Sequence, residues 1–208
     1  MIDAELISRW AEDAAAEPEH IRAARTAALE HGVDSISAAT GSYLASVVAM
    51  TRAQAIVEIG TGLGVSGMWL LTGSDECSIT SIDRDVDHQQ TARDLMAEAG
   101  ITMSRVRTIS GDAHEVLPRM NDGSYDLVVI DADAAHVIEY AKHALRLVRQ
   151  GGVVIVAHAS HGGSVANPAK RDEATSALRT LIGDYVVDDT VHASVLPVGD
   201  GVVTLVKN

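Results

Sequence analysis

Phenylalanine is absent from this chain of 208 residues, and aromatic residues of every kind make up only 3% of it. The core must therefore be built from valine, isoleucine, leucine, alanine and methionine. So few aromatic side chains argue against a nucleic-acid surface on which bases stack. A formal net charge of −13 is equally unsuited to a phosphate backbone or an anionic membrane. We therefore expect no nucleic-acid partner and no membrane partner.

Cysteine and long apolar runs are scarce as well. Cys77 is the only cysteine, so the chain can form no internal disulfide, which favours a reducing, cytoplasmic location. The acidic residues just before it favour a structural thiol over a nucleophilic one. No apolar run reaches 18 residues, and residues 1–16 carry no signal-peptide pattern, so we expect no membrane span.

Strand and helix patterns alternate along the chain. The predicted helices cover residues 4–31 (divided near Pro18), 37–50, 65–71, 87–99, 114–120, 137–148 and 170–182. The predicted strands cover residues 55–59, 78–83, 106–110, 125–131 and 153–157, followed by a hairpin of 186–196 and 202–206. This alternation implies a parallel sheet with helices on both faces. The last two strands have no helix between them, so one must be antiparallel to its neighbour.

A glycine-rich turn follows the first predicted strand. Gly60-Thr61-Gly62-Leu63-Gly64 places backbone N–H groups at the carboxyl end of a buried strand, a site suited to a nucleotide-like ligand. Its spacing departs from G-x-G-x-x-G, and it lacks the Lys-Ser/Thr of a phosphate loop. Taken alone, the turn could be no more than a tight connection between strand and helix.

Acidic residues stand at or just after four predicted strand ends, and four in one crevice are hard to attribute to solvation alone. They are Glu58, Asp83, Asp112 and Asp131. Glu58 would repel a pyrophosphate, whereas a carboxylate suits the amino group of a methionine moiety. Asp83 is placed to accept hydrogen bonds from two ribose hydroxyls. These two residues favour S-adenosylmethionine over a dinucleotide.

With these motifs the chain resembles the class I S-adenosylmethionine-dependent methyltransferases. From about Ser35 onward it is similar to the small O-methyltransferases of the catechol and caffeoyl-CoA type, including bacterial members. The motifs are Val57-Glu58-Ile59-Gly60-Thr61-Gly62, Ile82-Asp83, Ser110-Gly111-Asp112-Ala113, Asp126 to Asp133, Gly151-Gly152 and Gly199-Asp200-Gly201.

The resemblance implies an α/β, Rossmann-like fold with a seven-stranded, mostly parallel sheet whose last strand is antiparallel. We expect one domain over residues 1–208, with N-terminal helices at 1–50 and a cofactor-binding core at 51–208. The N-terminal helices would cover the mouth of the active site or a dimer interface. We expect a homodimer.

The resemblance also implies roles for individual residues. Glu58 would hold the methionine end of the cofactor, Ser66 its carboxylate and Asp83 its ribose. Asp131 would lie where methyl group, cofactor and acceptor meet. The other implied cofactor positions are Gly60 and Thr61 through their backbone, Arg84, Asp112 and Ala113 around the adenine, Ile36 through its backbone, and Asp133. Asp133 could instead only cap the following helix.

The chain departs from this family at the metal site. The family binds a divalent metal through the strand-end Asp and an Asp-Asn pair after the fifth strand, and a Lys helps to deprotonate the acceptor. The Asp is present as Asp131, but the pair falls on Ala157 and His158 and the Lys on Ala134. We therefore expect no metal ligand, and transfer to a hydroxyl of a small molecule without the family's Mg²⁺, with S-adenosylhomocysteine as the second product.

His158 is the candidate catalytic base beside Asp131, because an imidazole titrates near neutral pH. His161 and His136 lie in loops that could reach the same crevice, and the three histidines with Asp131 could form a zinc or iron site. They could also be ordinary polar loop residues. Two other functions stay open: a cofactor-binding protein that has lost catalysis, and a methyltransferase acting on nitrogen or carbon.

Overall fold

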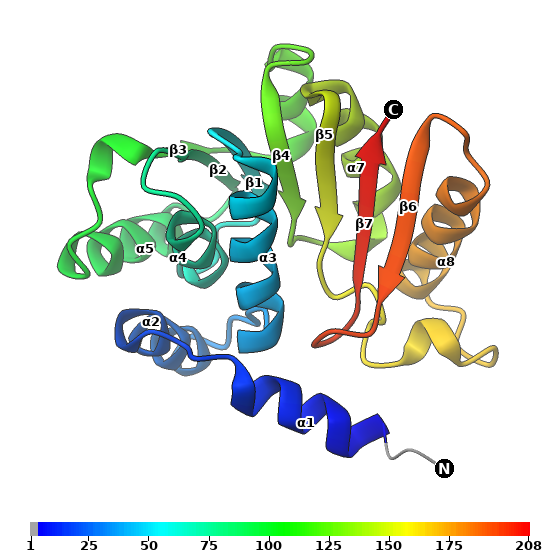
Figure 1. The fold of residues 1–208 in the computed structure, drawn as a ribbon, viewed down its shortest axis with the longest axis horizontal. Helices are drawn as coiled ribbons and strands as arrows, with labels where there is room; N and C mark the ends of the chain where they lie inside the picture. The colour runs from blue at the N-terminus through cyan, green and yellow to red at the C-terminus, as the bar shows by residue number, and fades with distance from the viewer. Residues whose placement is uncertain (1–3) are drawn as a thin grey trace.

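The structure is a computed structural model that describes residues 4–208. Seven strands form one sheet in the order β3-β2-β1-β4-β5-β7-β6 (Figure 1). The strands are β1 (Ala55–Ile59), β2 (Ser78–Asp83), β3 (Val106–Ser110), β4 (Tyr125–Ile130), β5 (Val148–Val156), β6 (Val191–Leu196) and β7 (Val202–Lys207). The first five run parallel, and β7 is antiparallel to both β5 and β6. The predicted seven-stranded sheet with an antiparallel last strand is confirmed.

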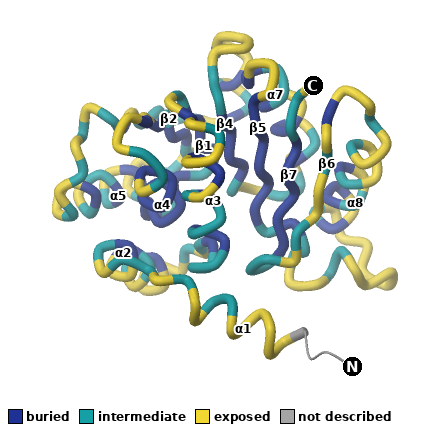
Figure 2. Tube along the Cα trace, viewed as in Figure 1, coloured by how far each residue is buried: buried dark blue, intermediate teal, exposed yellow. Residues whose placement is uncertain are grey.

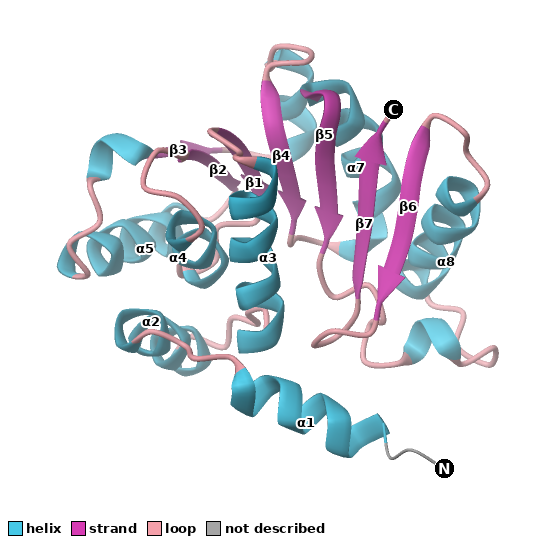
Figure 3. Ribbon diagram, viewed as in Figure 1, coloured by secondary structure: helices cyan, strands magenta, loops and turns pink. Residues whose placement is uncertain are grey.

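Helices cover both faces of the sheet (Figure 3). The helices are α1 (Ala4–Ala14), α2 (Glu19–Glu30), α3 (Ala38–Thr51), α4 (Val65–Thr72), α5 (Val86–Glu98), α6 (Ala113–Val116), α7 (Val137–Leu147) and α8 (Glu173–Val186). Four short 3₁₀ turns are η1 (Met103–Arg105), η2 (Leu117–Arg119), η3 (Ala134–His136) and η4 (Ser164–Ala166). The buried faces of α2 to α5 join one hydrophobic cluster, and those of α6 to α8 join a second cluster across the sheet. None of the helices in residues 4–208 is both long and apolar enough to cross a lipid bilayer.

The central strands supply the core between these two layers, and Figure 2 shows them buried along most of their length. On β1, Ile56 packs in the cluster under α3 and α4, while Val57 packs in the cluster under α7. This alternation is what the two-residue repeat of a strand requires when both faces are covered. Glu58 shares the face of Ile56 and is therefore carried into the interior beneath α4.

The sheet positions a crevice between β1 and β4. These strands are paired side by side and parallel, yet β1 leads into α4 on one face and β4 leads toward α7 on the other. Connections that leave in opposite directions open a gap at the carboxyl ends of the two strands, which is where open α/β sheets bind ligands.

Two predicted elements differ from the structure in their bounds. The helix predicted over residues 114–120 is a four-residue α6 followed by η2, because Pro118 has no N–H to continue α-helical bonding. The strand predicted from residue 153 begins at Val148. Its pairing with β4 shifts register between Tyr125 and Leu127, and Gly151, at φ +71°, allows the strand to turn there.

The last helix is also displaced from its prediction. It begins at Glu173, after Asp172 caps it by accepting from the backbone N–H of Thr175 at 2.9 Å. It runs on to Val186, which the sequence assigned to a strand, and β6 begins only at Val191.

Candidate active site

Three neighbouring cavities open at the carboxyl ends of the parallel strands, and Asp133 lines all of them. The Asp112 cavity, of about 70 Å³, is lined by Ile82 to Arg84, Gly111 to His114, His136 and Tyr140, among others. The Gly-turn cavity, of about 210 Å³, lies between residues 33–35, residues 60–66 and Asp131. The His158 cavity, of about 560 Å³, is lined by Asp34, Asp131 to Ala134, His158, His161, Gly162 and Asp200.

The glycine turn brings the end of β1 against the end of β4. Gly60 has φ +98°, and a Cβ atom there would lie 1.9 Å from the backbone oxygen of Asp131. Its N–H donates to the carbonyl of Ile82 at 2.8 Å. A side chain at this position would therefore push apart the two strand ends that form the crevice.

Asp83 holds this turn in place. Its Oδ2 accepts from the backbone N–H groups of Thr61 at 2.8 Å and Gly62 at 3.0 Å, and its Oδ1 accepts from that of Asp85 at 2.9 Å. The carboxylate lines both the Gly-turn cavity and the Asp112 cavity. It therefore lies between the positions predicted for the methionine and adenine ends of a cofactor.

Glu58 is fully buried and reaches the Gly-turn cavity indirectly, through hydrogen bonds to the hydroxyl groups of Ser66 and Ser81. Its Oε1 accepts from the Ser66 hydroxyl at 2.6 Å, and its Oε2 from the Ser81 hydroxyl at 2.5 Å. Burial raises the pKa of Glu58 to about 7. The hydrogen bonds from Ser66 and Ser81 lower this pKa, whereas the negative charges of Asp131 and Asp83 raise it further. Ser66 lines the cavity and Glu58 does not, so direct contact of Glu58 with a ligand stays a prediction.

Ile36 is also buried, and its carbonyl accepts from Nη1 of Arg25 at 2.5 Å. The residues that line the Gly-turn cavity from this segment are Val33, Asp34 and Ser35. These three residues were not among the predicted site residues, although the polar pair Asp34 and Ser35 just ahead of the Ser37 helix cap was a usable signal.

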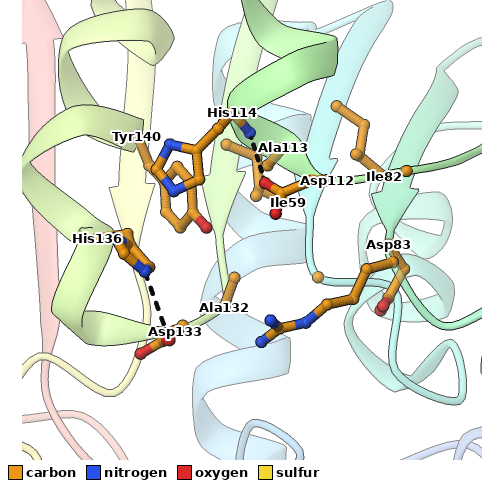
Figure 4. Close-up of a pocket in the computed structure, with 13 residues that line it drawn as sticks. Ile59, Ile82, Asp83, Asp112, Ala113, His114, Ala132, Asp133, His136 and Tyr140 are labelled. Atoms are coloured by element: carbon orange, nitrogen blue, oxygen red, sulfur yellow. Dashed lines mark hydrogen bonds and ion pairs between the residues drawn. The ribbon is translucent and has the colours of Figure 1, made fainter.

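The Asp112 cavity contains the residues expected around an adenine, together with three rings, of which only His136 was a candidate from the sequence. Arg84, Asp112 and Ala113 line the cavity, and Asp112 also caps α6. The additional rings belong to His114, His136 and Tyr140, with centroids 4.6 Å apart for the histidine pair and 5.0 Å for His114 and Tyr140. Figure 4 shows these rings gathered opposite Asp83. They give the cavity a wall against which a flat base can pack.

In the His158 cavity, two carboxylates flank the histidine. Nε2 of His158 lies 3.5 Å from Oδ1 of Asp131, and Nδ1 lies 3.5 Å from Oδ2 of Asp200. Nε2 is buried and makes no hydrogen bond to any residue of the described chain. Burial raises the pKa of Asp131 to about 6, with His158 opposing the rise and Asp34 adding to it. A partnerless ring nitrogen beside the junction of the cavities is suited to accept a proton.

The backbone of His158 is itself strained. The residue has φ +52°, in the left-handed region that a β-carbon disfavours, so surrounding contacts must hold it there. Asp200 supplies several of them: Gly162 N–H donates to its two carboxylate oxygens at 2.9 and 3.1 Å, and the Ser160 hydroxyl donates to Oδ1. The 199–201 turn thus holds the loop that carries the histidine.

The side chains present do not fit the divalent metal of the resembled family. Asp131 keeps one oxygen ligand, but a buried methyl stands at position 157 and an imidazole at 158. The zinc or iron site considered from the sequence is also not assembled. His161 lines the His158 cavity, but His136 lines the Asp112 cavity instead. Within residues 4–208, no three His, Cys, Asp or Glu side chains are grouped to hold a metal ion.

Asp133 caps the following helix, which is one of the two roles weighed for it. Its Oδ1 accepts from the N–H of Ala135 at 3.1 Å and so caps η3, while Nε2 of His136 lies 3.9 Å from its Oδ2. Because it also lines all three cavities, the helix cap and a ligand contact do not exclude one another.

Comparison with known proteins agrees with this arrangement. The sequence pattern that defines the O-methyltransferase family matches residues 11–208. A protein of Mycobacterium marinum assigned by name to the O-methyltransferases is 40% identical over 206 residues, which cover 99% of this chain and 92% of that protein. Among solved structures, a protein of Corynebacterium glutamicum aligns with a TM-score of 0.89 at 28% identity, covering 98% of this chain and 96% of its own.

A second solved structure carries a ligand. It is an O-methyltransferase of Streptomyces achromogenes involved in tomaymycin synthesis, determined in complex with S-adenosylmethionine. It aligns with a TM-score of 0.85 at 26% identity over the full length of both chains.

Proposed function

The chain belongs to the O-methyltransferase family, and from this premise we propose the reaction that its cavities support. The protein transfers the methyl group of S-adenosylmethionine to a hydroxyl oxygen of a small molecule, without the family's divalent metal. The observation that carries this proposal is the junction at Asp131 and Asp133. There the two cavities suited to the cofactor meet the larger His158 cavity.

The residues around the first two cavities fit the cofactor. The Gly60 to Gly62 turn and Ser66 suit its methionine end, Asp83 its ribose, and Arg84, Asp112 and Ala113 its adenine. Asp133 lies beside these residues, where the three cavities meet. When bound, the cofactor supplies a methyl group that is already activated by a sulfonium.

His158 performs the proton chemistry in this proposal. Methylation of a hydroxyl would form an O–C bond as the S–CH₃ bond of the sulfonium breaks, with S-adenosylhomocysteine as the leaving group, and the hydroxyl proton would pass to Nε2 of His158. Asp131, ionised above about pH 6, then lies beside the resulting imidazolium at 3.5 Å. Asp200 orients the ring through Nδ1 and the loop backbone. The work of the family's metal and lysine, binding and deprotonating the acceptor, falls to these three side chains.

The test combines cofactor binding with turnover. We expect calorimetry to detect S-adenosylmethionine binding that EDTA and Mg²⁺ leave unchanged, and S-adenosylhomocysteine release with hydroxylated small molecules. His158→Ala should lower turnover by about 100-fold or more while cofactor affinity stays within about twofold. The exposed His192→Ala is the matched control.

Each other outcome rejects a stated part of the proposal. Undiminished turnover in His158→Ala rejects the base, and turnover that requires Mg²⁺ rejects the metal-independent reaction. Cofactor binding without turnover of any hydroxylated compound favours a protein that has lost catalysis. Turnover of amines or carbon acids alone would identify a different acceptor atom.

We further propose that the protein acts as a homodimer in the cytoplasm. Ile7 and Trp10 on α1 are 51% and 69% exposed, although Glu12 of the same helix anchors it by accepting from the N–H of Ala39 at 2.9 Å. A fixed helix that presents large apolar side chains suits contact with a second copy. Light scattering should show a dimer that Trp10→Ser dissociates and that Leu29→Ser, exposed on α2, does not.

A further inference from the structure

We propose that the His158 cavity selects an acceptor that carries a positive charge close to its hydroxyl, as a hydroxylated amine does, and disfavours anionic acceptors. This inference rests on the proposed function, because it assigns a substrate class to the same cavity. Carboxylates and coenzyme A thioesters are the acceptors that it excludes.

The charge of the cavity lining carries the inference. Of the nine residues that line it, the ionisable ones are Asp34, Asp131, Asp133, Asp200, His158 and His161. Thus four carboxylates face a space of about 560 Å³, and neither lysine nor arginine is among the lining residues. At pH 7 to 8 a charged ligand entering this space meets a field of one sign.

The two histidines do not neutralise this field. His158 is shared between two of the carboxylates, Asp131 and Asp200, each 3.5 Å from a ring nitrogen. His161 lies 3.9 Å from a further acid, Asp172, outside the lining. Even with His158 protonated, the carboxylates of the cavity outnumber its cations.

Arginines near the cavity are engaged elsewhere. Arg25 pairs with Glu17 at 2.7 Å, and Arg179 donates to backbone carbonyls of the 164–170 segment. Arg84 lines the other two cavities but not this one. The lysine of the resembled family is replaced by Ala134, whose small side chain lines the cavity.

Asp34 is the carboxylate best placed to receive a cation. It is exposed, lines both the Gly-turn cavity and the His158 cavity, and has no cationic partner within residues 4–208. Asp131, Asp133 and Asp200 are each held by hydrogen bonds or by a histidine. An ammonium group paired with Asp34 would place a neighbouring hydroxyl toward the junction at Asp131.

A cationic acceptor also suits the chemistry. An ammonium group close to a hydroxyl withdraws electrons from it and makes its proton easier to remove, which assists His158. The carboxylates offset the repulsion between the acceptor cation and the sulfonium of the cofactor. Apart from the two imidazoles, no ring is among the lining residues, so charge rather than stacking must select the acceptor.

The experiment compares acceptors that share one ring and differ in the charge of the group next to the hydroxyl. The first trio is 2-(aminomethyl)phenol, 2-ethylphenol and 2-hydroxybenzoate, and a saturated trio is 2-aminocyclohexanol, 2-methylcyclohexanol and 2-hydroxycyclohexanecarboxylate. Binding to the protein loaded with S-adenosylhomocysteine is measured by calorimetry or ligand-detected NMR, and turnover is measured separately with S-adenosylmethionine. We expect the ammonium compound to bind about tenfold or more tightly than its neutral analogue, the anion to bind most weakly, and added salt to reduce the difference.

Two variants assign the effect to its residue. Asp34→Asn should reduce the ratio of ammonium to neutral affinity by about threefold or more. Asp75→Asn, which removes one exposed charge in the turn before β2, should leave that ratio unchanged. Equal reductions in both variants would mean that overall charge, and not this cavity, sets the preference, and would overturn the inference.

The outcomes separate this inference from the proposed function. Turnover without any preference for the ammonium compounds overturns the charge selection and leaves the methyl transfer standing. Ammonium preference in binding without turnover supports the selection and rejects the catalysis. Binding of neither ammonium compound overturns the inference, as does displacement of a bound ammonium compound by Mg²⁺, which would assign the carboxylates to a metal.

Discussion

Asp200 approaches His158 from the side opposite Asp131, with its Oδ2 3.5 Å from Nδ1 of the ring. The two residues come from distant segments, the turn between β6 and β7 and the loop after β5. They meet because β7 pairs with β5, which places the 199–201 turn against the 158–163 loop. Asp200 on Nδ1 and Asp131 on Nε2 together fix the orientation of the ring at the junction of the cavities.

Replacement of Asp200 tests this orienting role. Asp200→Asn should lower kcat by about 10- to 100-fold, with little change in cofactor affinity, because the carboxamide keeps the shape but not the charge. A purely structural residue would lower the amount of folded enzyme but leave kcat per folded molecule unchanged.

A matched control separates orientation from loop anchoring. Ser160→Ala removes one hydrogen bond of the loop to Asp200 but leaves the carboxylate in place. Its effect on kcat should be smaller than that of Asp200→Asn. Equal losses in both variants would contradict an orienting role.

Gly60 should tolerate no side chain. A Cβ atom 1.9 Å from the Asp131 oxygen, at φ +98°, forces the strand ends apart, so Gly60→Ala should lower the free energy of unfolding by more than about 2 kcal/mol. Cofactor binding should be lost as well. Gly183→Ala is the control, because that glycine lies within α8 with no atom within 4 Å of an added Cβ. It should stabilise the protein by about 0.5–1 kcal/mol in denaturant titration.

The sequence predicted the sheet better than it predicted the site. Strands at 55–59, 78–83 and 106–110 were placed at their observed bounds, because short apolar runs between turn signals have few alternatives. The start of β5 was missed, since the glycine pair at 151–152 signalled the end of a helix but lies inside a strand. There, pairing with β4 outweighs the local signal.

In the site, contacts between residues at neighbouring strand ends could be anticipated from the sequence, whereas contacts between distant segments could not. Asp131 and His158 follow the neighbouring strands β4 and β5, and their side chains lie 3.5 Å apart. The approach of Asp200 depends on how β7 pairs with β5, and the ring cluster of His114 and Tyr140 depends on how α6 packs against α7. Neither contact leaves a periodic signal in the sequence.

Cofactor affinity should depend on the ionisation of Asp131. Its pKa is raised to about 6, so the carboxylate beside the junction is largely protonated at pH 5 and ionised at pH 7. An ionised carboxylate attracts the sulfonium, and we expect S-adenosylmethionine to bind more tightly as pH rises from 5 to 7. S-adenosylhomocysteine, which lacks the sulfonium charge, should show a smaller change by calorimetry, and an equal change would contradict the assignment to Asp131.

Glu58 should lower the stability of the protein at neutral and alkaline pH. The pKa of Glu58 is about 7 in the folded protein, and its ordinary value of 4.5 applies in the unfolded chain. At pH values between 4.5 and 7, the folded state therefore binds more protons than the unfolded state. The free energy of unfolding should therefore fall as pH rises through this window, by about 3 kcal/mol from this group. Glu58→Gln removes the ionisation, and it should be more stable than the wild type at pH 8 by about 2 kcal/mol, with little difference at pH 4.5.

The same variant should weaken cofactor binding, because Ser66 would lose the charged acceptor that fixes its hydroxyl at the cavity wall. Ser81→Ala is the comparison, since it removes the other hydrogen bond to Glu58 but no residue of the wall. Denaturant titrations at several pH values, with calorimetry at pH 8, measure both effects. A Glu58→Gln protein that is less stable at pH 8, or that binds the cofactor as the wild type does, would show that the buried carboxylate is structural. Greater stability with weaker binding would show that it is kept in the interior for the ligand.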